Sequence, residues 1–310
     1  SRDCNVVISH HPIVFTGLKS LTGKNYIERT VLKAIKNNIA LYAIHTNLDN
    51  IDTGVNRMIA DRLSLQNVRV LEPKKDGLKM LITYVPNSHV EALRTALFAQ
   101  GAGSIGEYSE CHFSVDGIGT FKGSENSNPA IGQKGVRESV SEQRIELIFP
   151  SYIESKVIST LKTTHPYEEV AYSVLSLNNK NENVGSGMIG EISEPLNEME
   201  FLKNLKIKLK TDCIRYTSLI NSKIKTVALC GGAGRFLLNA AKQSGADIFI
   251  TSDFKYHEFF EAENRILLAD IGHYESEQFT IKLIADFLNK NFPRFAVHLS
   301  KVNTNPINYL

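Results

Sequence analysis

The chain has 310 residues, of which 42% are hydrophobic and 22% charged, an ordinary composition for a globular protein with a substantial core. Its net charge of +2 argues against a protein that binds nucleic acid mainly through electrostatics. The sequence contains no apolar run near the roughly 20 residues of a membrane-spanning helix, and no visible signal peptide. Four cysteines without disulfide or metal-site spacing indicate reduced thiols. We therefore expect a cytoplasmic protein of one large or two domains, with neither a membrane nor nucleic acid as a partner.

The N-terminal segment alternates strands and helices. Val6–Ser9 and Ile39–Ile44 are short, largely apolar runs typical of strands, whereas Tyr26–Asn37 and Val55–Leu63 have the spacing of helices. This alternation predicts βαβ units and a parallel sheet. The first strand begins almost at residue one and has no sheet neighbour before it. For that reason we expect the natural protein to extend further upstream.

Two polar, turn-forming runs enclose a second domain. The runs are Glu72–Gly77 and Asn178–Asn183. Between them the pattern strand, helix, strand occurs twice, which predicts a ferredoxin-like α+β fold. Within it, Gly117–Ser141 is rich in Gly, Ser and Asn and predicts a long loop that can contain short strands. The expected domains are an insert at 75–183 and one discontinuous α/β domain made of 1–74 and 184–310.

A glycine-rich loop follows a strand in the C-terminal segment. Lys225–Leu229 predicts the strand, Cys230–Gly234 the loop and Phe236–Ser244 a helix. Such a loop can hold a phosphate group at the helix N-terminus. It lacks the Lys-Ser/Thr pair of a Walker motif and the full spacing of a dinucleotide site. Close packing of the backbone is therefore an equally good interpretation.

Three of the predicted strands lead to side chains that bind metals. The last of them, Ile266–Asp270, leads to His273 and Glu277, which are four residues apart at a helix start and share one face. In open α/β sheets, ligands lie at the carboxyl ends of the strands, so three strands of one parallel sheet would bring these side chains together. Imidazole and carboxylate groups suit a divalent ion. The candidate set is His10, His11, His45, Asp49, His273 and Glu277.

Two further places carry side chains of the same kind. Asp253 follows the predicted strand Asp247–Thr251, so it is a candidate for supporting a ligand or for catalysis; His257 is a weaker one. Within the insert, His165–Glu169 (HPYEE) is either a turn before a strand or a cover for the metal site in an oligomer. We favour the turn, because Pro166 and the acidic pair suit a solvated position.

Together these motifs resemble one known family. The resemblance is carried by the runs ISHHPIVF, YAIHTNLDN, HPYEEVAY, GSGMIGEI, GADIFITSDFKYHE and ADIGHYESE. They are similar to dinuclear-metal-centre hexameric proteins, catalogued as GTP cyclohydrolase I type 2 homologues and as Nif-three-like proteins. The likeness spans nearly the whole chain, and the insert matches longer members with a PII-like (CutA-like) domain. Family members usually carry an upstream Trp-Asp-Asn motif, whereas this chain has no Trp.

The resemblance implies a three-layer Nif-three-like α/β domain that holds two divalent metal ions per chain. The implied ligands are His10, His11, Asp49, His273 and Glu277, with Glu277 bridging the ions and His45 adjacent to them. Because the set contains no thiolate, it suits Zn, Mn, Fe or Ni without distinguishing between them. The resemblance also implies a homohexamer, a toroid built as a trimer of dimers.

The predicted function is that of a metal-dependent hydrolase acting on a nucleotide-like substrate. Ring opening of GTP is the activity that the family name implies. Five protein ligands for two ions leave coordination positions free, as in catalytic sites, and Glu277 and Asp253 are the candidate catalytic residues. The alternative is a non-catalytic regulatory or protein-interaction module, in which the PII-like insert senses a small molecule.

Overall fold

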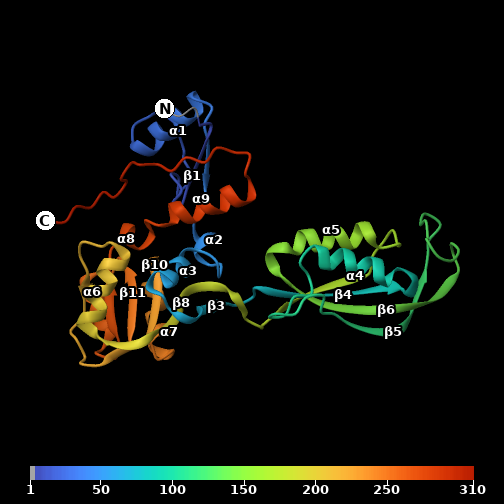
Figure 1. Ribbon diagram of the computed structural model, residues 1–310. Helices are drawn as coiled ribbons and strands as arrows, with labels where there is room; N and C mark the ends of the chain where they lie inside the picture. The colour runs from blue at the N-terminus through green and yellow to red at the C-terminus, as the bar shows by residue number, and fades with distance from the viewer. Residues whose placement is uncertain (1–3) are drawn as a thin grey trace. The chain divides into compact units, whose positions relative to one another are not determined.

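The structure, a computed structural model, describes residues 4–310 and divides into two compact units. Unit 1 comprises the described residues up to Pro73 together with Glu182–Leu310, and unit 2 comprises Lys74–Asn181. The chain thus leaves unit 1 once and returns once (Figure 1). No helix among residues 4–310 combines the length and the apolar character needed to cross a bilayer.

Unit 1 is built around a six-stranded mixed sheet with the strand order β3-β8-β10-β11-β12-β9. Strands β10, β11 and β12 are parallel, while β8 runs antiparallel to β10, and β9 to β12. The strands are β3 (Gln66–Lys74), β8 (Asn181–Asn197), β9 (Arg215–Tyr216), β10 (Lys223–Ala233), β11 (Ile248–Ser252) and β12 (Leu267–Asp270).

Helices cover both faces of this sheet, so that the unit has three layers (Figure 1). Helices α3 (Val55–Leu63) and α6 (Glu198–Leu209) pack on one face, and α7 (Leu238–Gln243) and η4 (Tyr256–Ala262) pack on the other. Alternate residues of a strand point to opposite faces. The central strands therefore need apolar residues at every position, and this is why they read as continuous apolar runs. The remaining helices of unit 1 are α1 (Tyr26–Lys36), α2 (Thr46–Asp49), η3 (Arg235–Leu237), α8 (His273–Glu277) and α9 (Thr280–Asn291).

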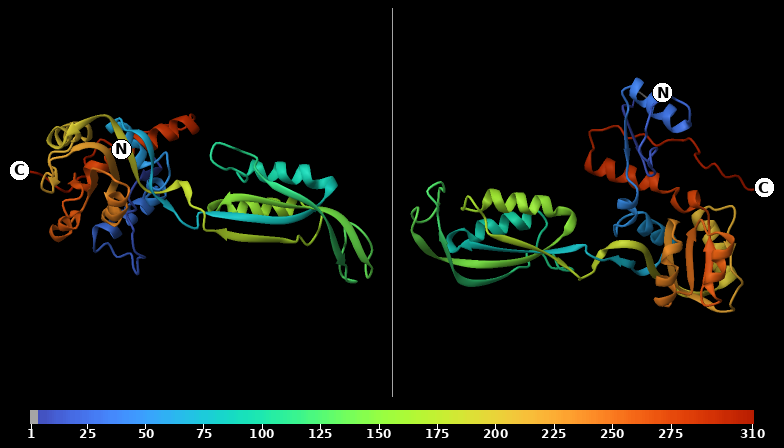
Figure 2. Two further views of the ribbon diagram at one scale, coloured as in Figure 1. Left: turned by 90° about the horizontal axis from the view of Figure 1, so that it is seen from below. Right: turned by 180° about the vertical axis from the view of Figure 1, so that it is seen from behind.

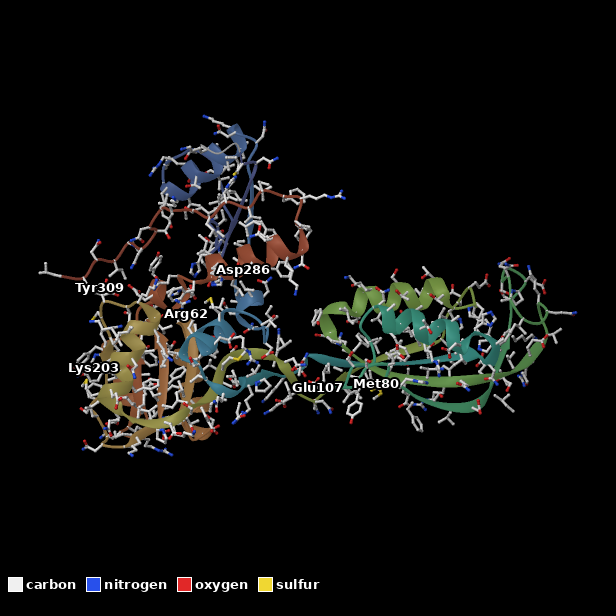
Figure 3. The ribbon with its side chains drawn as sticks, viewed as in Figure 1. Arg62, Met80, Glu107, Lys203, Asp286 and Tyr309 are labelled. Atoms are coloured by element: carbon white, nitrogen blue, oxygen red, sulfur yellow. The ribbon has the colours of Figure 1, made fainter. Side chains whose placement is uncertain are left out.

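Helix α3 shows how sequence spacing becomes packing. Val55, Ile59 and Leu63 recur every four residues and are all buried against the sheet. At the end of the helix, the guanidinium carbon of Arg62, a residue labelled in Figure 3, lies 3.3 Å from the centre of the ring of Phe279, which precedes α9. This cation–π contact joins α3 to the segment between α8 and α9.

The N-terminal candidate ligands lie on a separate sheet. Strands β1 (Val6–Ser9) and β2 (Ala40–Ala43) are parallel and, among the described strands, pair only with each other. The expectation that the three ligand-bearing strands share one parallel sheet is therefore wrong, because β12 belongs to the six-stranded sheet. A run of apolar residues indicates a strand but carries no information on its partner. The two short strands still end level with each other, since Ser9 pairs with Ala43.

Unit 2 is a four-stranded antiparallel sheet with both of its α-helices on one face (Figure 2). The strand order is β5-β6-β4-β7, and the chain follows the β-α-β-β-α-β order of a ferredoxin-like unit. Leu93 and Leu161 of the helices are fully buried against Leu81 and Phe149 of the sheet. The elements are β4 (Leu78–Pro86), η1 (Asn87–His89), α4 (Val90–Ala99), β5 (Phe113–Lys122), β6 (Arg137–Pro150), η2 (Ser151–Ile153), α5 (Glu154–Thr164) and β7 (Tyr172–Leu177).

The predicted loop Gly117–Ser141 is a loop only at residues 123–136, because residues 117–122 belong to β5 and residues 137–141 to β6. Strands β5 and β6 pair continuously from Phe113 opposite Glu146 to Lys122 opposite Arg137. Most residues of this end of the hairpin are exposed or half-buried. Small and charged residues are therefore tolerated there, and the apolar alternation that marks a half-buried strand is missing.

Candidate metal centre

Segments that follow β1, β2 and β12 bring the candidate ligands together in unit 1. His10 and His11 follow β1, and His45 directly precedes α2. Asp49 is the last residue of α2. Helix α8 begins at His273 and ends at Glu277. Three overlapping groups have their ligand atoms within 4.8 Å of one another: His10, His11 and His45; His11, His273 and Glu277; and His10, Asp49 and Glu277.

Oxygen Oε2 of Glu277 lies at the middle of the cluster. It is 3.3 Å from Nε2 of His11, 3.3 Å from Nε2 of His273 and 3.6 Å from Nε2 of His10. Nε2 of His10 is in turn 3.5 Å from Oδ1 of Asp49. Glu277 therefore belongs to two groups of three at once.

Three atoms of the cluster are buried and lack any hydrogen-bond partner among the described residues. They are Nε2 of His10, Oδ1 of Asp49 and Oε2 of Glu277. Burying a polar atom without a partner costs roughly 1–3 kcal/mol, so three unpaired atoms that converge on one place require an explanation. A bound cation would satisfy all three together. The donor set of the chain therefore fits a metal centre.

Hydrogen bonds on the far side of two rings determine which nitrogen can bind a metal. Nδ1 of His10 donates to the carbonyl of Ile44 (2.9 Å), and Nδ1 of His273 donates to Oδ2 of Asp253 (2.6 Å). In the neutral ring, each Nε2 is then left with its lone pair, and that lone pair is directed into the cluster. Partners of this kind orient metal-binding histidines in many proteins.

The electrostatics of the cluster favour positive charge. Burial alone would raise the pKa of Glu277, but the imidazoles of His10 and His273 outweigh it and lower this pKa to about 2. The carboxylates of Glu277 and Asp253, with Glu277 the larger influence, together raise the pKa of His273 to about 9 against the effect of burial. Burial raises the pKa of Asp49 to about 6. Without a metal, protons on the imidazoles therefore supply the positive charge that the carboxylates require.

His45 lies beside the cluster but outside both groups that contain Glu277. Its ring centroid is 5.3 Å from that of His10 and 4.9 Å from that of His11. The ring centroid of Phe15 lies 5.7 Å from that of His45.

Several residues that support the ligands do not stand out in the sequence. The buried amide of Asn56 donates to the carbonyl of Asp49 (2.9 Å) and accepts from the backbone N–H of Gly231 (2.8 Å). The hydroxyl of Ser276 accepts from the backbone N–H of Gly232 (2.9 Å). These contacts hold α8 and the segment before α3 against β10. A polar residue at a position of α3 that faces the core is the one available signal, and it points to Asn56.

The glycine-rich run 230–234 packs against the cluster. Gly232 has a φ of +64°, and a Cβ atom there would lie 2.4 Å from Oε1 of Glu277. Most of the run is the last part of β10, and only a short 3₁₀ turn and the six-residue helix α7 follow it. Of the two interpretations of this run, the structure favours close packing of the backbone over a phosphate loop.

The other metal-type residues are engaged elsewhere. His165 in unit 2 is buried; its Nε2 donates to the carbonyl of Tyr84 (2.8 Å), and its Nδ1 accepts from the backbone of Tyr167 (3.1 Å). The HPYEE run thus has its histidine in structural hydrogen bonds of unit 2. His257 packs edge-on against Tyr256 and belongs to none of the three groups found among the described residues.

Comparisons with known proteins agree along the length of the chain. A family model described as Duf34/NIF3 (NGG1p interacting factor 3) matches residues 1–306. A Bacillus subtilis protein named "GTP cyclohydrolase 1 type 2 homolog" is 38% identical over 315 residues, covering 100% of this chain and 84% of that protein. A Listeria monocytogenes protein of the same name is 37% identical over 258 residues, covering 83% of this chain and 69% of that protein.

Two crystal structures are similar over almost the whole chain. A Bacillus cereus protein described as related to NIF3 has 38% sequence identity and a TM-score of 0.83, covering 99% of this chain and 83% of that one. A Staphylococcus aureus protein has 30% identity and a TM-score of 0.72, covering 99% of this chain and 82% of that one.

Proposed function

The chain belongs to the Duf34/NIF3 family, and on that premise we propose that it is a metal-dependent hydrolase with a dinuclear centre and a nucleotide-like substrate. One observation carries the proposal. Glu277, whose Oε2 is buried and unpaired, belongs to two groups, one with His11 and His273 and one with His10 and Asp49. A carboxylate shared in this way is suited to bridge two ions. The relatives named "GTP cyclohydrolase 1 type 2 homolog" support a nucleotide as the substrate class.

The residues of the chain divide the work of such a site. Two divalent ions, with Zn, Mn, Fe and Ni as the candidates, would supply a water nucleophile near neutral pH and stabilise negative charge that develops on the substrate. His10 and His273 present fixed Nε2 lone pairs, because Ile44 and Asp253 hold their Nδ1–H groups. The geometry supports a positioning role for Asp253, whose carboxylate contacts the side of His273 that faces away from Glu277.

Exposure of the cluster differs from one side to the other. The His11 side chain is 42% exposed, whereas the His10 and Glu277 side chains are 10% and 8% exposed. A substrate would therefore approach from the His11 side, and the buried carboxylate would remain shielded from water. Water exclusion on the buried side strengthens each electrostatic contact there.

Metal analysis of purified protein, combined with substitutions, tests the centre. Glu277→Gln keeps the shape of the side chain but removes its charge, so it should lower both metal equivalents per chain. Asp49→Asn should lower mainly one. His112→Ala, on a histidine of unit 2 that contacts Arg94, is the control and should retain both. Two equivalents bound by Glu277→Gln with wild-type affinity would contradict the bridging role.

Turnover tests the catalytic part of the proposal separately. The metal-loaded chain should release product from at least one nucleotide of a panel that includes GTP, and chelation should abolish the release. A chain that binds two ions but turns over none of the panel would instead support the regulatory alternative.

The same proposal includes the character of unit 2 and the assembly. We propose that unit 2 is a PII-like insert. Two features support this proposal: its β-α-β-β-α-β order and the position of both α-helices on one face of its sheet. We also propose a homohexamer arranged as a trimer of dimers. Sedimentation analysis of the metal-loaded protein tests the assembly, and a stable monomer would contradict it.

A further inference from the structure

An exposed aromatic ring borders the candidate metal centre. Phe15 lies between β1 and α1, and it is 68% exposed. Its ring centroid is 5.7 Å from that of His45 and 6.5 Å from that of His11. Single exposed apolar residues are common on proteins, but this ring touches the imidazoles on the open side of the cluster. A molecule bound at the centre would therefore lie next to it.

His45 fixes how the Phe15 ring is presented. The two rings cross at 88°, the edge-to-face arrangement that aromatic pairs prefer. His45 is in turn packed against His10 and His11. It is not a member of either candidate metal-binding group that contains Glu277. The imidazole can therefore support the phenyl ring while the other histidines bind metal.

We infer that Phe15 is a stacking platform for the planar base of a nucleotide bound at the metal centre, and that His45 holds its ring in position. The inference rests on the proposed function and adds which part of the substrate is recognised and by which residue. Phosphate oxygens suit a cationic centre, whereas a neutral base requires a separate surface. The largely exposed phenyl ring of Phe15 beside that centre supplies one, because every base can stack on an aromatic ring without a hydrogen-bonding pocket.

Two ligands that differ only in the base give the matched measurement. We would titrate the full, Zn²⁺-loaded chain with GMP and with ribose 5-phosphate by calorimetry. The wild-type chain should bind GMP more tightly. Phe15→Leu should weaken GMP binding by about five- to a hundredfold, leaving ribose 5-phosphate binding and metal content unchanged, and Phe15→Tyr should retain the GMP affinity. The control is Phe260→Leu: Phe260 is also 68% exposed, and its ring meets that of Tyr256 edge to face.

Three results would overturn the platform. They are unchanged GMP binding by Phe15→Leu, an equal loss for GMP and ribose 5-phosphate, and a wild-type chain that binds none of GMP, AMP, CMP and UMP more tightly than ribose 5-phosphate. His45→Ala should lower GMP affinity without loss of metal; loss of a metal equivalent would make His45 a ligand and refute its supporting role.

Failure of the inference can be told apart from failure of the proposed function. Binding that depends on Phe15 without any turnover would refute the hydrolase and leave the platform in place. A value of kcat/KM for nucleotide turnover that Phe15→Leu leaves unchanged would refute the platform and leave the hydrolase in place.

Discussion

Gly232 allows the metal centre to be perturbed while every candidate ligand stays in the chain. Its φ of +64° lies in the left-handed region, and a Cβ atom there would be 2.4 Å from Oε1 of Glu277 and 3.4 Å from Nε2 of His273. Gly232→Ala should therefore force the Glu277 carboxylate out of its present position.

The size of the effect follows from these distances. Ordinary contacts between heavy atoms begin near 3.5 Å, so the carboxylate must move by roughly 1 Å. Metal–oxygen bonds of roughly 2.0–2.2 Å tolerate changes of only about 0.2 Å, and such a shift would break them. We expect metal affinity to fall at least about 10- to 100-fold, the range seen when supporting residues of metal sites are changed. The left-handed backbone adds about 1 kcal/mol of destabilisation.

Gly245→Ala is the matched control, because Gly245 has a φ of +74° and a Cβ atom there would meet nothing within 4 Å. It carries the backbone penalty alone. Competition with a chromogenic chelator measures metal affinity, and thermal unfolding measures stability in both variants. If Gly232→Ala kept wild-type metal affinity while losing only as much stability as Gly245→Ala, the close approach of this backbone to Glu277 would not matter for binding.

Two other predictions concern pH and the role of unit 2. In metal-free protein, the raised pKa of His273, about 9, means that its stabilising contribution is complete below about pH 6.5 and is lost as pH rises through 9. The melting temperature of the chelated protein should therefore fall as pH rises from about 6 to 9.5. Asp253→Asn should make this fall smaller, because it removes one of the carboxylates that raise the pKa of His273. A melting temperature independent of pH over this range would contradict the assignment. Replacing Lys74–Asn181 with a short Gly/Ser linker should leave metal content unchanged, because the three candidate groups lie in unit 1, and a folded deletion protein without metal would refute this independence.

Periodicity predicts the buried elements of this chain well. Helix α3 begins and ends at the predicted residues, Val55–Leu63. The polar run Glu72–Gly77 is predicted as a turn, but β3 extends into it as far as Lys74. β3 is an edge strand of its sheet, and edge strands tolerate charged residues that make them look like turns.

Only part of the candidate site can be predicted from local sequence. Strand-end positions identify His10, Asp49 and Glu277, which the structure brings together. The contacts that hold them join residues far apart in the chain, such as Asn56 and Gly231. No local pattern encodes such a pair, because each partner alone is an ordinary buried amide or a flexible glycine.

The place where unit 2 interrupts unit 1 also bears on how the protein folds. β3 and β8 are neighbours in the six-stranded sheet, yet unit 2 separates them in sequence. If unit 2 were unfolded, pairing these strands would close a loop of roughly 100 residues, about 3 kcal/mol harder in entropy than closing a hairpin turn. Once unit 2 has folded, β4 and β7 pair antiparallel from Leu78 opposite Leu177, which brings the ends of the insert together before the sheet forms. Unit 2 then connects β3 and β8 as a short turn would, so its prior folding would favour assembly of unit 1, although it supplies none of the candidate ligands.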